Sequence, residues 1–381
     1  MSFAALSRGL TSRRTSHMGG NMALTRTDEM ELLTALHDGL HETPRWSSFL
    51  ERLRRRTRAD YASLIFSQGQ APIHRATQVH AGRDVRARAH ELEELARLDP
   101  IPYERLRPGR VYAPEELIDP TDPRHDRFRR EYLHRIGIGH GRFMRVTEPG
   151  GTSAWAVLLR DKENFTASDG AVLAALQPHL SIALRNFAVL ERERLRAHVS
   201  EDVLRRAGLA WAVIGGDGAV QLSSSAAGPL LTATGARISA GSVEAERRLA
   251  RIAELFTAQP DAPPQIAPLD DEEDGALIAL PIAEKPLTAP AMPAYAAVAR
   301  LPRALDNRHA RLLAARHGLS ASEAGLALAL ARGRSIAEAA ATLRLSLETA
   351  RNYSKKIYAK TGTRGQADLV RVVLDSVTLL A

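Results

Sequence analysis

The sequence predicts an α+β region over residues 28–302 and an all-α module over residues 303–381. The front part alternates strand-like apolar runs with helical or loop segments, whereas the last part contains only short amphipathic helical patterns. The basic charge is also concentrated at the end. Residues 302–381 contain 13 Lys and Arg against 6 Asp and Glu, and residues 1–301 contain 39 against 38. A basic module on a balanced chain suits a negatively charged partner, either a phosphate backbone or an anionic membrane surface.

Residues 1–25 contain arginines but no acidic residue, and they include Met18 and Met22. We interpret them as a disordered tail or as residues upstream of the true start codon. The chain lacks a secretory signal and a window of about eighteen uninterrupted apolar residues. We therefore expect a cytoplasmic protein that does not enter a membrane. Because the sequence has no cysteine, disulfides, a thiol nucleophile and cysteine-based zinc sites are excluded.

A first sensory domain is predicted over residues 28–198. It begins with an amphipathic helical pair over residues 29–58, which Pro44 interrupts. Strand-like runs follow, and they alternate with helical or loop segments, at residues 61–67, 73–80, 141–148 and 153–160. This order, closed by one long helix, resembles a sensor domain of the GAF type. The resemblance implies an α+β fold in which residues 60–165 bind a small-molecule effector or a partner.

The stretch LARLDPIPYERL, residues 95–106, contains the candidate ligand contact of this domain. Its Asp99-Pro100 pair resembles the Asp-Pro of acyl-homoserine-lactone sensors, which implies that Asp99 contacts a ligand. An Asp-Pro pair is also a common turn and helix-stop signal. Both interpretations are open at this point.

A long helix is predicted from Thr166, which Asp169 joins in an N-terminal capping box, to about His198. Pro178 should kink it. Apolar residues recur three and four positions apart, as in a coiled-coil seam, at Leu173, Leu176, Leu180, Ala183, Phe187 and Leu190. This row is the candidate homodimer seam. The alternative is that it packs on the helix's own domain.

A second domain is predicted over residues 200–302. Residues 208–231 have the pattern of a strand, a turn, a second strand and a small helix, and later strands are expected at residues 275–282 and 294–302. This pattern resembles a reduced PAS domain. Between the strands, residues 261–274 contain six acidic residues and no basic one. We interpret that segment as a solvated acidic loop.

Four short helices are predicted in residues 303–381. Three of them begin with a capping box, formed by Ser320 with Glu323, Ser335 with Glu338 and Thr363 with Gln366. Ser346 caps the remaining helix, which is basic along one side and ends at Gly362. Two short helices followed by a longer basic helix are typical of the helix-turn-helix motif, in which the second helix of the pair enters the major groove of DNA.

Residues 319–370, LSASEAGLALALARGRSIAEAAATLRLSLETARNYSKKIYAKTGTRGQADLV, resemble the LuxR-type DNA-binding module of bacterial transcription regulators. The match includes the opening Leu-Ser-x-x-Glu and the segment from Gly333 to Leu343. Ala350 and Tyr353 depart from the family, which usually has Val and His at these packing positions. The resemblance implies a four-helix LuxR-type domain in a transcription regulator. We expect such a regulator to bind double-stranded DNA as a homodimer, with RNA polymerase as a further partner.

The resemblance also implies which residues contact DNA. Arg351, Asn352 and Lys355 would face base edges, since Arg or Lys suits guanine and Asn suits adenine. Contacts to the DNA backbone are assigned to Thr349, Lys356, Lys360 and Arg364. The alternative is that these charges form a solvated helix face without a ligand.

No catalytic site, metal site or cofactor is predicted, because the sequence lacks a Gly-x-Ser-x-Gly elbow, a His-Glu-x-x-His helix and a phosphate-binding loop with its lysine. Two other functions stay open. A sigma-factor-like polymerase subunit would need an aromatic-rich promoter-melting region, and aromatic residues make up 5% of this chain. A sensor enzyme with an unrecognised catalytic site would convert a metabolite.

Overall fold

The computed structural model describes residues 25–66, 76–85, 93–269, 276–287, 289, 291–301 and 305–376. The predicted tail over residues 1–25 lies almost wholly outside the described residues. The chain divides into two compact units, Met1–Glu193 and Arg194–Ala381, and the boundary falls inside helix α8 (Gln177–Arg206). None of the described helices combines the length and the apolar character that crossing a membrane requires.

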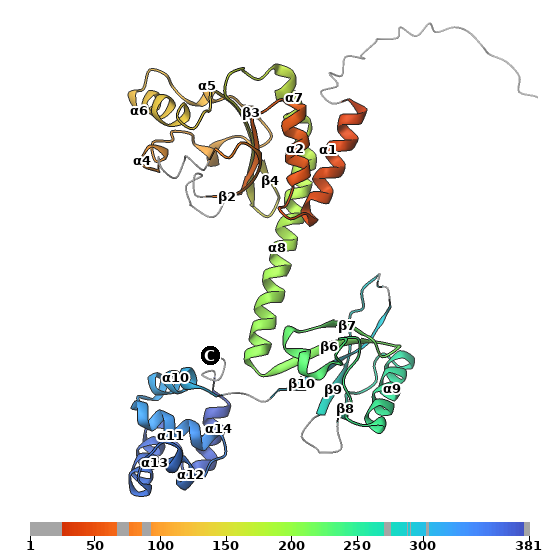
Figure 1. The fold of residues 1–381 in the computed structure, drawn as a ribbon, viewed down its shortest axis with the longest axis vertical. Coiled ribbons are helices and arrows are strands. Elements are labelled where there is room, and N and C mark those ends of the chain that lie inside the picture. The colour runs from red at the N-terminus through yellow and green to blue at the C-terminus, as the bar shows by residue number, and fades with distance from the viewer. Residues whose placement is uncertain are drawn as a thin grey trace, which may run out of the picture. The chain divides into compact units, whose positions relative to one another are not determined.

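The first unit is built on a five-stranded antiparallel sheet with the order β2-β1-β5-β4-β3. Its strands are β1 (Tyr61–Phe66), β2 (Thr77–Gly82), β3 (Val111–Tyr112), β4 (His140–Thr147) and β5 (Ser153–Arg160). Figure 1 labels its strands β2, β3 and β4. Every residue of the central strand β5 is buried. This explains its sequence, SAWAVLLR, which is apolar almost throughout because both faces of the sheet are covered.

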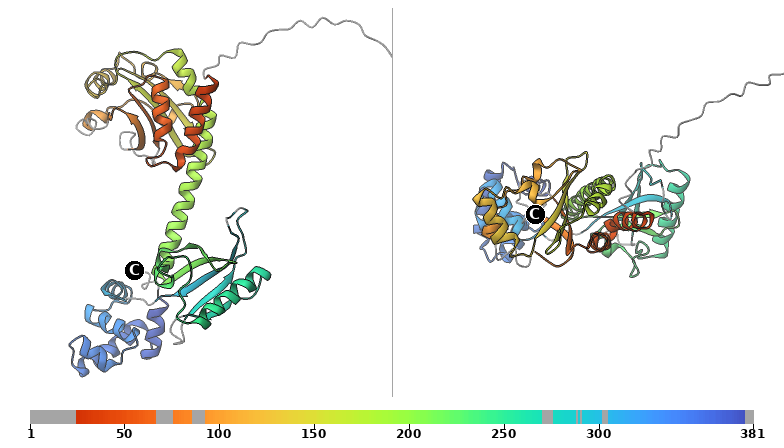
Figure 2. Two further views of the ribbon diagram at one scale, coloured as in Figure 1. Left: turned by 45° about the vertical axis from the view of Figure 1, so that its right-hand side comes forward. Right: turned by 90° about the horizontal axis from the view of Figure 1, so that it is seen from above.

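Long helices cover one face of this sheet, and Figure 2 shows the same layer from two further sides. They are α1 (Arg26–Asp38), α2 (Ser47–Arg56), α7 (Ala167–Ala175) and α8, with the short η1 (Gly39–His41) beside them. Leu36, Phe49, Leu173 and Leu180 pack there against sheet residues such as Leu158 in one apolar core.

Short elements cover the opposite face of the sheet. They are α4 (Glu93–Ala96), η4 (Tyr103–Arg105), α5 (Pro114–Leu117), α6 (Pro123–Arg127) and η5 (Phe128–Leu133), a π-helical turn. Their apolar side chains form a second core with Tyr61, Trp155 and Val157, which point from the sheet toward this side. The sheet therefore separates two apolar layers of different construction.

The long helix differs from its prediction in two ways. It is interrupted at Leu176, where α7 ends, and Pro178 lies in the first turn of α8, a position that tolerates proline. Helix α8 then continues to Arg206 instead of ending near His198. The predicted capping box of Thr166 and Asp169 is present, with the two side chains 2.9 Å apart.

Most residues of the predicted homodimer seam are buried within the first unit. Leu173, Leu176, Leu180 and Ala183 are at most 3% exposed and belong to the core of the first unit. The Phe187 ring contacts the rings of Trp46 and Phe66, each with a centroid distance of 5.1 Å. The three-and-four spacing of the row, which also includes the partly buried Leu190, therefore describes a helix that packs on its own domain. Leucine spacing alone does not distinguish these two arrangements.

The second unit contains another five-stranded antiparallel sheet, with the order β7-β6-β10-β9-β8. Its strands are β6 (Leu209–Gly215), β7 (Val220–Ser223), β8 (Gln265–Pro268), β9 (Ala276–Pro281) and β10 (Pro293–Arg300). Helix α9 (Val243–Ala258) packs against this sheet, and η6 (Ser225–Leu230) follows β7. Helix α9 was not expected from the sequence.

The predicted acidic loop over residues 261–274 is partly wrong. Gln265–Pro268 forms the edge strand β8, and residues 270–274 lie outside the described part of the chain. This strand was not predicted from the sequence because it is flanked by Pro263 and Pro264 and contains Pro268, and proline is uncommon in strands. An edge strand tolerates it, since one side of its backbone makes no ladder.

The C-terminal region contains five described helices instead of the four predicted. They are α10 (Asn307–His317), α11 (Ala321–Ala331), α12 (Ile336–Thr342), α13 (Leu347–Thr361) and α14 (Gln366–Leu374). The capping boxes of Ser320 and Ser335 are present. The third predicted box is wrong, because Gly365 is the N-cap of α14 and Gln366 instead donates to the carbonyl oxygen of Arg334.

We expect Leu180→Ala to lower the free energy of unfolding of the first unit by about 2–5 kcal/mol, because it leaves a cavity in a closed core. The control is Val189→Ala on the same helix, where the side chain is exposed and the change should be about 0.5 kcal/mol or less. Urea unfolding in a Trp211→Phe background would measure this, since Trp46 and Trp155 then report on the first unit. A change in self-association without a change in stability would contradict the packing assignment.

Candidate functional site

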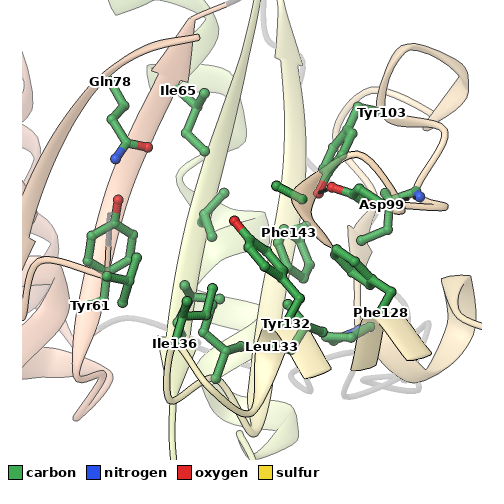
Figure 3. A pocket seen from close by; sticks show the side chains of 17 residues that line it. Tyr61, Ile65, Gln78, Asp99, Tyr103, Phe128, Tyr132, Leu133, Ile136 and Phe143 are labelled. Atoms are coloured by element: carbon green, nitrogen blue, oxygen red, sulfur yellow. Dashed lines mark hydrogen bonds between the residues drawn. The ribbon is translucent and has the colours of Figure 1, made fainter. Parts of the chain in front are cut away.

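A pocket of about 120 Å³ lies on the face of the first sheet that the short elements cover (Figure 3). Tyr61, Ile65, Val157 and Leu159 point into it from β1 and β5, because alternate residues of a strand face the same side. Phe128, Tyr132 and Leu133 reach it from the π-helical turn η5. Most of the lining is aromatic or aliphatic. Such a pocket with few polar groups is typical of small-molecule sites.

Asp99 places a carboxyl group in this apolar lining. Its oxygens accept hydrogen bonds from the backbone N–H of Ile101 at 3.0 Å and from the Tyr103 hydroxyl at 2.8 Å. Burial raises the pKa of Asp99 to about 6, and these two hydrogen bonds oppose the rise. Burial, and then the Asp99 charge, raises the pKa of Tyr103 well above its usual value, so its hydroxyl stays a donor.

The loop that carries Asp99 is attached to the sheet through Tyr103. The Trp155 indole N–H donates to the Tyr103 carbonyl oxygen at 3.3 Å, and the two rings meet edge to face. Both interpretations of Asp99 are therefore compatible with the structure: its Asp-Pro pair follows the turn after the short helix α4, and its carboxyl lines the pocket. Contact with a ligand stays a prediction.

Gln78 supplies a further polar group, which was not predicted from the sequence. It lies on the edge strand β2, opposite Ile65 of β1, and its side chain lines the pocket. The amide nitrogen is buried, and no hydrogen-bond partner exists for it among the described residues. An unpaired buried donor costs free energy unless a ligand or water satisfies it. Only the alternation of β2 could have placed Gln78 on this face, and that strand was predicted to start earlier.

Helix α13 contains the predicted base-reading residues. Arg351, Asn352 and Lys355 are exposed, whereas Ala350, Ser354 and Ile357 are buried against the other C-terminal helices. The side chains of the three exposed residues make no hydrogen bond or ion pair within the described chain. They therefore share one solvent-facing side of a helix whose opposite side is fixed in a core.

The predicted backbone contacts are less uniform. Lys356 and Arg364 are exposed, and Thr349 lies in the first turn of α13, where its hydroxyl is 2.7 Å from that of the N-cap Ser346. Lys360 differs, because its ammonium lies 2.6 Å from the buried Glu323 carboxylate of α11. This ion pair joins two helices, and it holds the pKa of Glu323 below its usual value. Since an ammonium has three donors, contact with DNA stays a prediction for Lys360.

A tight turn connects α12 and α13. The N–H of Leu345 donates to the Ala340 carbonyl and the N–H of Arg344 donates to that of Ala341, which is the Schellman arrangement. Arg344 has a φ of 54°, in the left-handed region that usually favours glycine. This turn ends α12 abruptly and lets Ser346 begin α13 only two residues later.

Comparisons with known proteins give only weak similarities in sequence and structure. No family model and no curated protein matches the chain. CepR2 of Burkholderia cenocepacia, an N-acylhomoserine-lactone-dependent LuxR-family factor, is 16% identical over 42% of this chain and 95% of its own, with a TM-score of 0.31. SdiA of Escherichia coli is 12% identical over 87% of this chain and 92% of its own, with a TM-score of 0.25. VqmA of Vibrio cholerae, a LuxR-type receptor, is 13% identical over 44% of this chain and 83% of its own, with a TM-score of 0.17. TM-scores this low do not assign the chain to a family.

We expect Asp99→Asn to stabilise the first unit at pH 8 by roughly 1–3 kcal/mol, because the folded wild type must keep a half-buried carboxylate charged. The folded pKa of about 6 lies above the unfolded value near 3.8, so the wild type binds a proton on folding between these values. The difference in stability between the wild type and Asp99→Asn should therefore shrink as the pH falls from about 6 to about 4. Urea unfolding at pH 4, 6 and 8 would measure it.

The matched control for this prediction is Asp119→Asn. Asp119 is exposed, and hydrogen bonds from Thr121 lower the pKa of its carboxyl. This variant should gain no stability at pH 8. A difference between Asp99→Asn and the wild type that did not change with pH would contradict the assigned pKa.

Proposed function

We propose that the chain is a sequence-specific DNA-binding transcription regulator that responds to a small molecule bound in its first unit. The observation that carries this proposal is the two-sided character of α13. Arg351, Asn352 and Lys355 are exposed on one side, and the other side is buried in a helical core. The resemblance of residues 319–370 to the LuxR-type module supports the same proposal.

In this proposal α13 enters the major groove of DNA. Arg351 and Lys355 lie four positions apart on the helix, so they project from one side, with Asn352 beside them. Arg351 and Lys355 would donate to O6 and N7 of guanine, and Asn352 would pair with adenine. Binding through a side that makes no internal contacts requires no rearrangement of the module.

Contacts to the DNA backbone would fix the position of this helix. Lys356 follows the base-reading residues on the exposed surface, and Arg364 lies just beyond Gly362, where α13 ends. Thr349 lies near the N-terminus of α13, where free N–H groups favour a phosphate. Neutralising phosphates releases counterions from DNA, which makes the affinity depend on salt. The excess of Lys and Arg over Asp and Glu in residues 302–381 suits contact with a phosphate backbone.

The small-molecule response is proposed from the pocket that contains Asp99 and Gln78. It lies within the segment over residues 60–165 that the sequence analysis assigned to an effector. Both polar groups are attached to the sheet: Gln78 lies on β2, and the loop that carries Asp99 is hydrogen-bonded to Trp155 of β5. A ligand that occupies the pocket would stabilise the first unit by mass action.

We also propose that the regulator binds DNA as a homodimer. One helix in one groove contacts only a few base pairs, too few to select a site within a genome. Two copies held about one helical turn of DNA apart read an inverted repeat. The dimer contact must lie outside the row from Leu173 to Ala183, because those residues are buried in the first unit.

We expect Arg351→Ala to reduce affinity for the specific DNA site by roughly 1–3 kcal/mol and affinity for random DNA much less, because it removes a base contact. Lys356→Ala is the control on the same helix. It should weaken both kinds of DNA alike and reduce the slope of log affinity against log salt by about one. Fluorescence anisotropy with a site selected from a random duplex pool would measure both. Equal losses for Arg351→Ala on the two DNAs would make Arg351 a backbone contact.

We expect sedimentation velocity to show two protein chains on a duplex that carries the inverted repeat, since each half-site needs its own reading helix. A duplex with one half-site destroyed is the control, and it should bind more weakly. A single chain on the intact repeat, at concentrations that saturate it, would exclude the homodimer.

A further inference from the structure

The size of the pocket in the first unit limits what it can hold. Its volume is about 120 Å³. An apolar protein cavity of about 150 Å³ holds one benzene molecule. This pocket, which is open on one side, therefore has room for a body of about one ring, or for a short aliphatic group of similar size. A longer chain would have to extend through the open side of the pocket.

Besides the hydroxyl-bearing Tyr61, Tyr103 and Tyr132, two polar side chains line the pocket, Asp99 and Gln78, and they have opposite hydrogen-bonding requirements. Asp99 presents carboxylate oxygens, which can only accept hydrogen bonds when ionised, and no Lys, Arg or His is among the described residues that line the pocket. Gln78 presents an amide N–H that lacks an acceptor. Figure 3 shows the two side chains on opposite sides of the pocket, with apolar side chains such as Ile65 and Phe143 between them.

Taken together, these features define the complementary molecule. Its apolar body must bury against Phe128, Tyr132 and Val157. A hydroxyl or N–H at one end would donate to Asp99, and this bond would be strong because the acceptor is charged. A carbonyl or similar oxygen at the other end would accept from Gln78 and end the cost of its unpaired donor.

We propose that the effector is a compact molecule of about one ring in size that donates a hydrogen bond to Asp99 and accepts one from Gln78. This inference rests on the small-molecule response proposed above and specifies its chemistry. Gln78 then determines specificity, because a molecule of the same shape without the acceptor would leave the Gln78 donor buried and unpaired. The structure thereby assigns Gln78 a role that its sequence context did not indicate.

The test uses the full chain and single-ring probes in ligand-observed NMR titrations. The probes 3- and 4-hydroxyacetophenone carry both groups at two spacings, 4-ethylphenol carries only the hydroxyl, and acetophenone carries only the carbonyl. We expect the better hydroxyacetophenone to bind about threefold to tenfold more tightly than 4-ethylphenol, and about tenfold more tightly than acetophenone. Each ratio isolates one polar contact while the ring is unchanged.

Two variants then locate the contacts. Gln78→Leu keeps a side chain of similar size, and it should remove the preference for hydroxyacetophenone over 4-ethylphenol while leaving the preference over acetophenone. Asp99→Ala should remove the preference for hydroxyacetophenone over acetophenone while leaving the preference over 4-ethylphenol. The fluorescence of Trp46 and Trp155 in the Trp211→Phe background would confirm that each variant is folded. The probe ratios on the wild type test the proposal even where a variant unfolds.

The proposal is overturned if both hydroxyacetophenones bind the wild type no more tightly than the single-group probes, or if Gln78→Leu keeps the preference for the carbonyl. Failure of this proposal can be told apart from failure of the proposed function. DNA binding that depends on Arg351 is measured without any probe, and probe binding is measured without DNA. A positive result in one experiment and a negative result in the other would identify which assignment is wrong.

Discussion

The two-sided burial of β5 is the constraint on which the first unit depends. Ala154, Ala156 and Leu158 face the long helices, whereas Trp155, Val157 and Leu159 face the short elements. Long helices bring continuous apolar stripes to a sheet and can fill the space against it. Short helices, a π-helical turn and loops cannot match a pleated surface as closely, and the pocket lies on that side. The position of the pocket thus follows from the lengths of the elements on each face.

Local signals in the sequence predicted much of the C-terminal region. A capping box needs only two residues three positions apart, so Ser320 with Glu323 and Ser335 with Glu338 identified helix starts without any knowledge of the fold. The exposed and buried sides of α13 also follow from helical spacing alone. Where the local signal was weaker, the prediction failed. Thr363 is buried and bonds to Thr361, while Gly365 begins α14.

Features that depend on distant parts of the chain could not be predicted in the same way. The row that contains Leu180 satisfies both a dimer seam and an internal face, and only its contacts with α1, α2 and the sheet decide between them. Strand β8 was missed because prolines obscured its pattern. Asp99 was identified through a short motif. Gln78 reaches the same pocket through strand pairing, which joins residues distant in sequence.

Helix α11 is buried over almost its whole length and contacts α10, α12, α13 and α14. The ion pair of Glu323 with Lys360 adds a polar connection from this helix to α13. A helix enclosed in this way cannot shift without disturbing every neighbour, since packed interiors transmit strain and do not deform gradually. The C-terminal helices should therefore behave mechanically as one stiff body. In the dimeric regulator proposed above, an upstream signal would then change whether, and at what spacing, two such bodies are presented to DNA, and would leave the shape of the reading surface unaltered.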